Sequence, residues 1–132
     1  MSTDELITYC LAKKGAFIDY PFGPDVTIIK VKSQNSKARI FAQFFALKDE
    51  EKATFNCSAV AGEFYRSIYP GAVTRGYHCP PVQQPYFNTV ALGGDVPDGE
   101  LLAMVDHAYE MAVGKLPKWA QRELNGGDKS AG

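Results

Sequence analysis

The stretch YPGAVTRGYHCPPVQQPYFNTVAL, residues 69–92, decides how this chain is organised. It starts where a helical pattern stops at Pro70 and Gly71, and it ends in the aromatic and β-branched run 86–92. Between them, Tyr77 and His78 precede a proline-rich loop over 79–85. This order predicts a hairpin with a long, stiff tip, inserted between two helices.

The residues before this hairpin predict one helix followed by strands. Ser2 and Glu5 have the spacing of a capping box, so we expect a helix over 3–14 that ends at Gly15. Turn residues at 19–25 follow a short extended piece at 16–20. Alternating or phenylalanine-rich runs then predict strands at 26–32, 38–48 and 52–57, the first two as a hairpin.

Helical periodicity returns at Ser58 and again after the turn at 93–97. In the first of these helices Val60, Phe64 and Ile68 form one line, which we expect to face the sheet. The second helix ends at Pro117, with an inner face of Leu101, Val105, Ala108, Ala112 and Leu116. We therefore predict that Phe55, Phe64, Val105 and Tyr109 are buried where the two helices meet the sheet. A short helical turn is expected at 117–124 and disorder at 125–132.

These patterns predict an α+β fold with two layers, an antiparallel sheet with helices packed on one face. The expected order is one helix, three or four strands, a helix, two strands and a helix. With 132 residues and 45% hydrophobic content, residues 1–124 are expected to form one domain.

Charge and cysteine content narrow the function classes. Fifteen acidic and fourteen basic residues leave a net charge of -1, so any nucleic-acid binding needs a local patch. The acidic start MSTDEL and the short apolar runs predict neither a signal peptide nor a membrane span, hence a cytoplasmic protein. Three cysteines without a CxxC pair predict reduced thiols.

A positive segment lies between Asp25 and Asp49. It holds five basic residues and no acidic one: Lys30, Lys32, Lys37, Arg39 and Lys48. Clustered lysine and arginine bind phosphate backbones, so the hairpin could serve as a DNA-contacting wing. The alternative is that these charges only protect an exposed sheet edge from aggregation.

No pattern in the chain requires catalysis. His78 and Cys79 are neighbours, but adjacent strand residues point to opposite faces. Walker, GxGxxG, HExxH and GxSxG motifs are missing from the sequence. We expect no catalytic residues, no cofactor, no metal and no enzymatic activity.

Five segments in order resemble the MmcQ/YjbR family of small bacterial proteins. They are LAKKGA, DYPFG, YPGAVTRGYH, the NTV strand and the VP…DHAYE…KLP helix. The resemblance implies a CyaY-like or secretion-chaperone-like α+β fold and a double-wing arrangement that binds double-stranded DNA. Where the family commonly has lysines and a Trp-Asn pair in the second wing, this chain has PPVQQP and Phe87-Asn88.

Two functions follow as expectations. The first is DNA binding through a basic hairpin and a second wing, with the candidate residues Lys30, Lys32, Lys37, Arg39, Arg75, Tyr77, His78 and Asn88. The second is a protein-interaction or chaperone-like module that binds a partner through the exposed sheet face and the PPVQQP loop.

Overall fold

The structure is a computed structural model, which describes the backbone of residues 1–76 and 79–131 and the side chains of 1–76 and 79–126. Its elements, in chain order, are α1 (Thr3–Leu11), β1 (Ala16–Asp19), β2 (Thr27–Val31), β3 (Arg39–Leu47), β4 (Glu50–Asn56), α2 (Ala59–Ile68), β5 (Val73–Arg75), the 3-10 turn η1 (Gln84–Tyr86), β6 (Phe87–Ala91), α3 (Asp98–Gly114) and α4 (Lys118–Ala131). Within the described part of the chain, no helix combines the length and the hydropathy needed to cross a bilayer.

The strands form one antiparallel sheet in the order β1-β2-β3-β4-β6-β5. The predicted hairpin of β2 and β3 is confirmed, with a bulge between Ile29 and Lys30. The second hairpin is also confirmed, but its first strand lies earlier than expected, at Val73–Arg75. Residues Tyr77 and His78, predicted to lead into the hairpin loop, lie outside the described residues. The α+β, antiparallel fold predicted from the sequence is therefore the fold observed.

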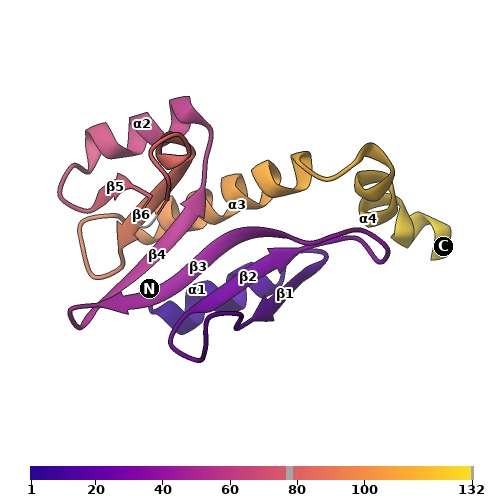
Figure 1. Cartoon of the computed structure of the whole chain (residues 1–132), viewed down its shortest axis with the longest axis horizontal. Coiled ribbons are helices and arrows are strands. Elements are labelled where there is room, and N and C mark those ends of the chain that lie inside the picture. The colour runs from indigo at the N-terminus through magenta and orange to yellow at the C-terminus, as the bar shows by residue number, and fades with distance from the viewer. Residues whose placement is uncertain (77–78, 132) are drawn as a thin grey trace.

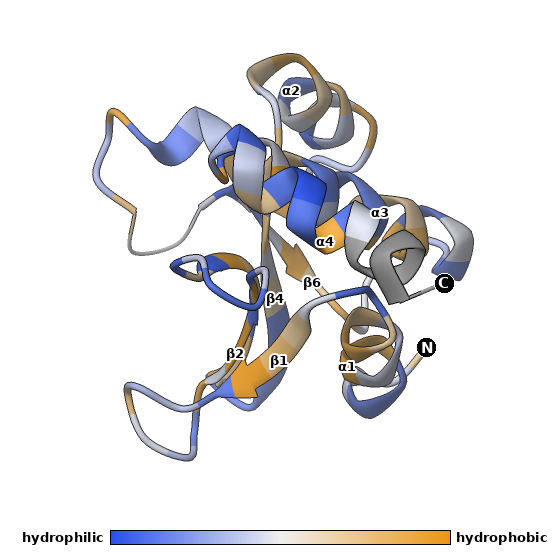
Figure 2. Ribbon diagram, turned by 90° about the vertical axis from the view of Figure 1, so that its right-hand side faces the viewer, coloured by the Kyte–Doolittle hydropathy of each residue, from blue (hydrophilic) through white to orange (hydrophobic). Residues whose placement is uncertain are grey.

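Helices cover one face of this sheet (Figures 1 and 2). Helix α3 lies across β2, β3 and β4, and its predicted inner face is confirmed as core, since Leu101, Val105, Ala108 and Ala112 are all buried. The helix ends at Gly114, before the predicted end at Pro117, and Leu116 is buried just beyond it. Phe55 is buried as predicted, and Tyr109 is partly buried with its ring 5.5 Å edge-on from that of Phe41. The helical period alone placed these residues correctly, because α3 packs against the sheet along its full length.

Helix α1 begins as expected and ends early. The capping box of Ser2 and Glu5 is present, with Glu5 N–H donating to Ser2 Oγ at 3.1 Å. The helix stops at Leu11, three residues before the predicted end, because the chain must turn back into β1. Ala16 N–H donates to the carbonyl of Lys13, and Gly15 takes the left-handed φ of 79° that this turn requires.

The predicted inner face of α2 is wrong. Val60 and Phe64 are 82% and 56% exposed, and Ile68 is 44% exposed. The helix instead turns Gly62 inward, where an added Cβ would lie 2.7 Å from Cys57 Sγ. Glycine at position 62 lets α2 pack closely against Cys57, because any larger side chain would collide there. This close packing outweighs the apolar periodicity of the helix.

The last helix is longer than the predicted turn at 117–124. Helix α4 extends from Lys118 to Ala131 and so includes most of the segment 125–132, for which disorder was predicted. Ala120 and Leu124 are buried in the core and hold the first half of the helix in place. Once such a turn is anchored, each further residue adds a helical hydrogen bond at low cost.

Candidate nucleic-acid interface

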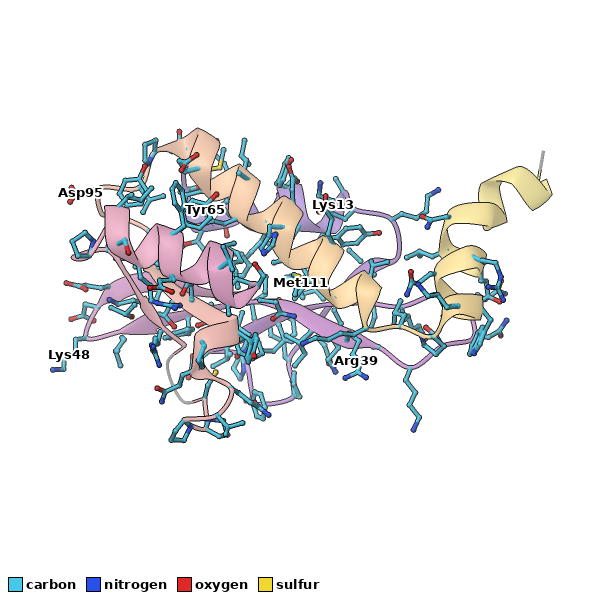
Figure 3. All side chains as sticks on the ribbon, turned by 90° about the horizontal axis from the view of Figure 1, so that it is seen from above. Lys13, Arg39, Lys48, Tyr65, Asp95 and Met111 are labelled. Atoms are coloured by element: carbon cyan, nitrogen blue, oxygen red, sulfur yellow. The ribbon has the colours of Figure 1, made fainter. Side chains whose placement is uncertain are left out.

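The tip of the β2–β3 hairpin meets α4 at one end of the molecule (Figures 1 and 3), and both segments carry exposed basic side chains. We call this surface the basic end and define it by Lys32, Lys37, Arg39, Lys118 and Arg122, all exposed. None of the five forms an ion pair with another residue that the structure describes. Their charges are therefore available to a ligand.

A hydrogen-bonded contact joins the two elements of the basic end. The carboxylate of Glu123 in α4 accepts from the backbone N–H and the side-chain amide of Asn35, each at 2.9 Å. The neighbouring Ser33 hydroxyl and the hydrogen bonds from Asn35 lower the pKa of Glu123. The acid thus bonds to neutral groups of the hairpin turn and not to the neighbouring bases.

A hollow of about 480 Å³ lies at the base of this contact. Lys14 and Lys32 line it together with Phe17 and Glu123. The ammonium group of Lys32 lies 5.9 Å from the centre of the Phe17 ring, a cation–π contact that leaves its charge exposed. Two lysines from different connecting segments, one before β1 and one after β2, therefore face one concave surface.

Lys30, one of the predicted DNA-contacting residues, forms an ion pair within the domain. Its ammonium group lies 2.8 Å from the carboxylate of Asp19 on the neighbouring strand β1. The hydrogen bond from Lys30 lowers the pKa of Asp19, so the pair stays ionised and locally neutral. A phosphate would have to compete with a carboxylate already in place.

The other predicted residues do not join the basic end. Arg75 is exposed on β5, and three strands separate it from β2, which corresponds to about 19 Å at the usual strand spacing. Asn88 is only 3% exposed. Tyr77 and His78 lie outside the described residues. The two predicted wings are thus parts of one sheet with β4 between them.

Asn88 has a structural role that its place in a hairpin did not reveal. Its amide nitrogen donates to the carbonyl of Gly62 at 3.2 Å, and its amide oxygen accepts from Arg66 at 2.6 Å. Both partners belong to α2, so Asn88 fixes this helix to β6. The structure corrects the prediction that Asn88 contacts DNA, because its polar atoms are buried and bonded within the domain.

Asn88→Ala should lower the free energy of unfolding by about 1 to 3 kcal/mol, since it leaves a buried carbonyl and a guanidinium without their partner. Chemical denaturation measures the loss. Thr74→Ala, an exposed change on β5, serves as the control and is expected within about 0.5 kcal/mol. A loss for Asn88→Ala no larger than the control would contradict the anchoring role.

Two residues of the basic end, Lys118 and Arg122, and the adjacent Trp119 were missed from the sequence. The signal was present in the run KWAQR directly after Pro117, in which Lys118 and Arg122 are one helical turn apart. It was missed because this segment was expected to be only a short turn. Trp119 is 46% exposed beside these charges.

The three cysteines have raised thiol pKa values, and His107 is hydrogen-bonded within the domain. Burial raises the pKa of the Cys10 thiol to about 12 and that of Cys57 to about 11, and desolvation also raises the pKa of Cys79. His107 Nε2 accepts from the Ser58 N–H at 3.0 Å. Over the described residues, no group of three or more histidine, cysteine, aspartate or glutamate side chains could hold a metal ion.

Comparison with known proteins finds a family by sequence and a shared fold by structure. The YjbR family model matches residues 11–111. The YjbR proteins of Escherichia coli K12 and O157:H7 are each 28% identical over 124 residues, which is 94% of this chain and 98% of theirs.

Two solved structures share the fold. The Deinococcus radiodurans protein DR2400, of the DUF419 domain, aligns with a TM-score of 0.83 at 24% identity, over 94% of this chain and 88% of its own. A Pseudomonas syringae protein aligns with a TM-score of 0.68 at 14% identity, over 85% and 99%.

Proposed function

This chain belongs to the YjbR family, and on that premise we propose that it is a non-enzymatic protein that binds double-stranded DNA through its basic end. The observation that carries the proposal is the clustering of five exposed basic side chains from the hairpin and α4, none of them in an ion pair with a described residue, in a chain whose net charge is -1. Such a chain attracts a polyanion only where its charges are segregated.

The acidic and basic side chains are segregated along the long axis of the molecule. Figure 3 shows Asp95 at the far end from α4, and the exposed Asp49, Glu50 and Glu51 line a hollow with Gly94, next to Asp95 in the chain. A phosphate backbone would be repelled there and attracted at the basic end. The orientation of the protein on DNA would then be set by charge before any base is contacted.

The shape of the basic end suits a backbone contact. The hairpin tip and the first turns of α4 project side by side, because Asn35 and Glu123 hold them together. Lys37 and Arg39 come from one element and Lys118 and Arg122 from the other, so adjacent phosphates could be contacted from two sides. Trp119 adds an exposed aromatic ring beside them.

The test is the salt dependence of binding to a duplex of random sequence. Each phosphate contact contributes about 0.9 to the slope of log K against log salt. Lys37→Gln with Arg39→Gln should therefore flatten the slope by a little under two units, and adding the Lys32, Lys118 and Arg122 changes should flatten it by about four and a half in all.

A matched control comes from the opposite end of the sheet. Lys48→Gln with Lys52→Gln removes the same charge near the β3–β4 turn and should leave the slope unchanged. Thermal melts verify that each variant folds. Equal slopes for the two double variants, or binding by the wild type that does not respond to salt, would reject the basic end as the DNA contact.

A second candidate function is a protein-interaction module, and one observation favours it. The stripe of Val60, Phe64 and Ile68 on α2 is exposed, which is uncommon for three large apolar side chains on one helix face. If duplex DNA does not bind even at low salt, this surface is the better starting point. It differs from the sheet face and loop expected from the sequence for this role.

A further inference from the structure

The face of the sheet that no helix covers carries an apolar hollow. Strand β3 would show polar side chains on a solvated face, yet Ile40, Phe45 and Leu47 are half-buried there. Their neighbours Ala42 and Phe44 point into the core on the other side. Figure 2 shows the helices α1 and α3 on the same side of the sheet. Strand β3 is therefore apolar on both faces, although helices cover just one.

Two loops turn this bare face into a site. The loop between β1 and β2 contributes Phe22, Asp25 and Val26, and the loop before β6 contributes Cys79. With β3 as the floor, they enclose about 540 Å³. Pockets that bury a small organic molecule have volumes of roughly 300 to 1,000 Å³ and are mostly apolar, with few polar groups.

One charged side chain lines the described part of the hollow. Asp25 is the only charged side chain among the described residues that line it, and it forms no ion pair with any of them. The two lysines on the same face are already neutralised, Lys30 by Asp19 at 2.8 Å and Lys52 by Glu50 at 3.5 Å. Its described lining therefore presents a single negative charge together with the aromatic rings of Phe22 and Phe45.

We infer that this hollow binds an apolar small molecule that carries one positive charge, such as an aromatic amine. The apolar part lies on Ile40, Phe45 and Leu47, and the ammonium group lies at Asp25, where the carboxylate and the ring faces both attract a cation. The amide of Gln43, which also lines the hollow, offers a neutral hydrogen-bonding group on the floor. The site is separate from the basic end, so it does not depend on the DNA-binding proposal.

Three probes that differ in one group test the inference: 1-naphthylmethylamine, 1-naphthalenemethanol and 1-naphthoate. Binding is followed by two-dimensional amide NMR, which also locates the site. We expect the amine to bind about fivefold more tightly than the alcohol, and the carboxylate to bind most weakly. The shifted amides should belong to β3 and to residues 22–26.

Asp25→Asn should remove the preference for the amine and leave the affinity for the alcohol unchanged. Asp95→Asn is the matched control, because it makes the same change at an exposed position away from the hollow and should keep the preference. Phe45→Ser should weaken all three probes, with a thermal melt to show that the variant folds. Shifts confined to the Val60, Phe64 and Ile68 stripe, equal affinities for amine and carboxylate, or no binding at about 1 mM would overturn the assignment.

Discussion

Phe55→Ala should lower the free energy of unfolding by about 3 to 5 kcal/mol. Phe55 is 2% exposed on β4, with its ring 6.1 Å from that of Phe44 and nearly perpendicular to it. The substitution removes the transfer free energy of the ring and leaves a cavity between the sheet and the helices. The strands around it are fixed by ladder hydrogen bonds on both sides, so the site cannot collapse fully.

Phe64→Ala is the matched control for this prediction. The side chain is the same, but it is 56% exposed on α2 and its ring contacts only the neighbouring Tyr65 among the aromatic residues described. We expect a loss of about 0.5 kcal/mol or less. Urea denaturation of both variants measures the contrast. Similar losses would show that α2 buries the face that its periodicity suggested and not the face observed.

Gly15→Ala should cost about 2 to 5 kcal/mol, from two causes that add. The φ of 79° disfavours any residue with a Cβ by about 1 to 2 kcal/mol. The new Cβ would also collide with the carbonyl oxygen of Lys32 and lie 2.6 Å from Leu124 Cδ1. Overpacking of this kind costs about 1 to 3 kcal/mol more. The substitution would disturb the packing at the point where β1, β2 and α4 meet.

Gly23→Ala separates the two causes. Gly23 has a φ of 96°, but an added Cβ would meet nothing within 4 Å. Its replacement should cost only the backbone term, about 1 to 2 kcal/mol. Thermal or chemical denaturation of the two variants gives the difference. Equal losses at the two glycines would mean that the contact with Lys32 and Leu124 relaxes without cost.

The sequence by itself determined the elements whose environment is uniform along their length. The inner stripe of α3 is buried as its period predicts, because one face of this helix lies on the sheet throughout. The hairpin of β2 and β3 and the capping of α1 follow from local chemistry, which needs no distant partner. The basic character of the hairpin was equally legible in the run between Asp25 and Asp49.

Only the tertiary structure decided which of those residues face solvent and which are engaged. Lys30 and Asn88 looked like surface groups, but Asp19 and Arg66, which are 11 and 22 residues away in the chain, bind them. The orientation of α2 was set by the close packing of Gly62 against Cys57, which outweighed three large apolar residues. Helix α4 joined the basic end through the bond between Asn35 and Glu123, 88 residues apart. Periodicity reports the composition of a face, whereas long-range contacts determine what that face meets.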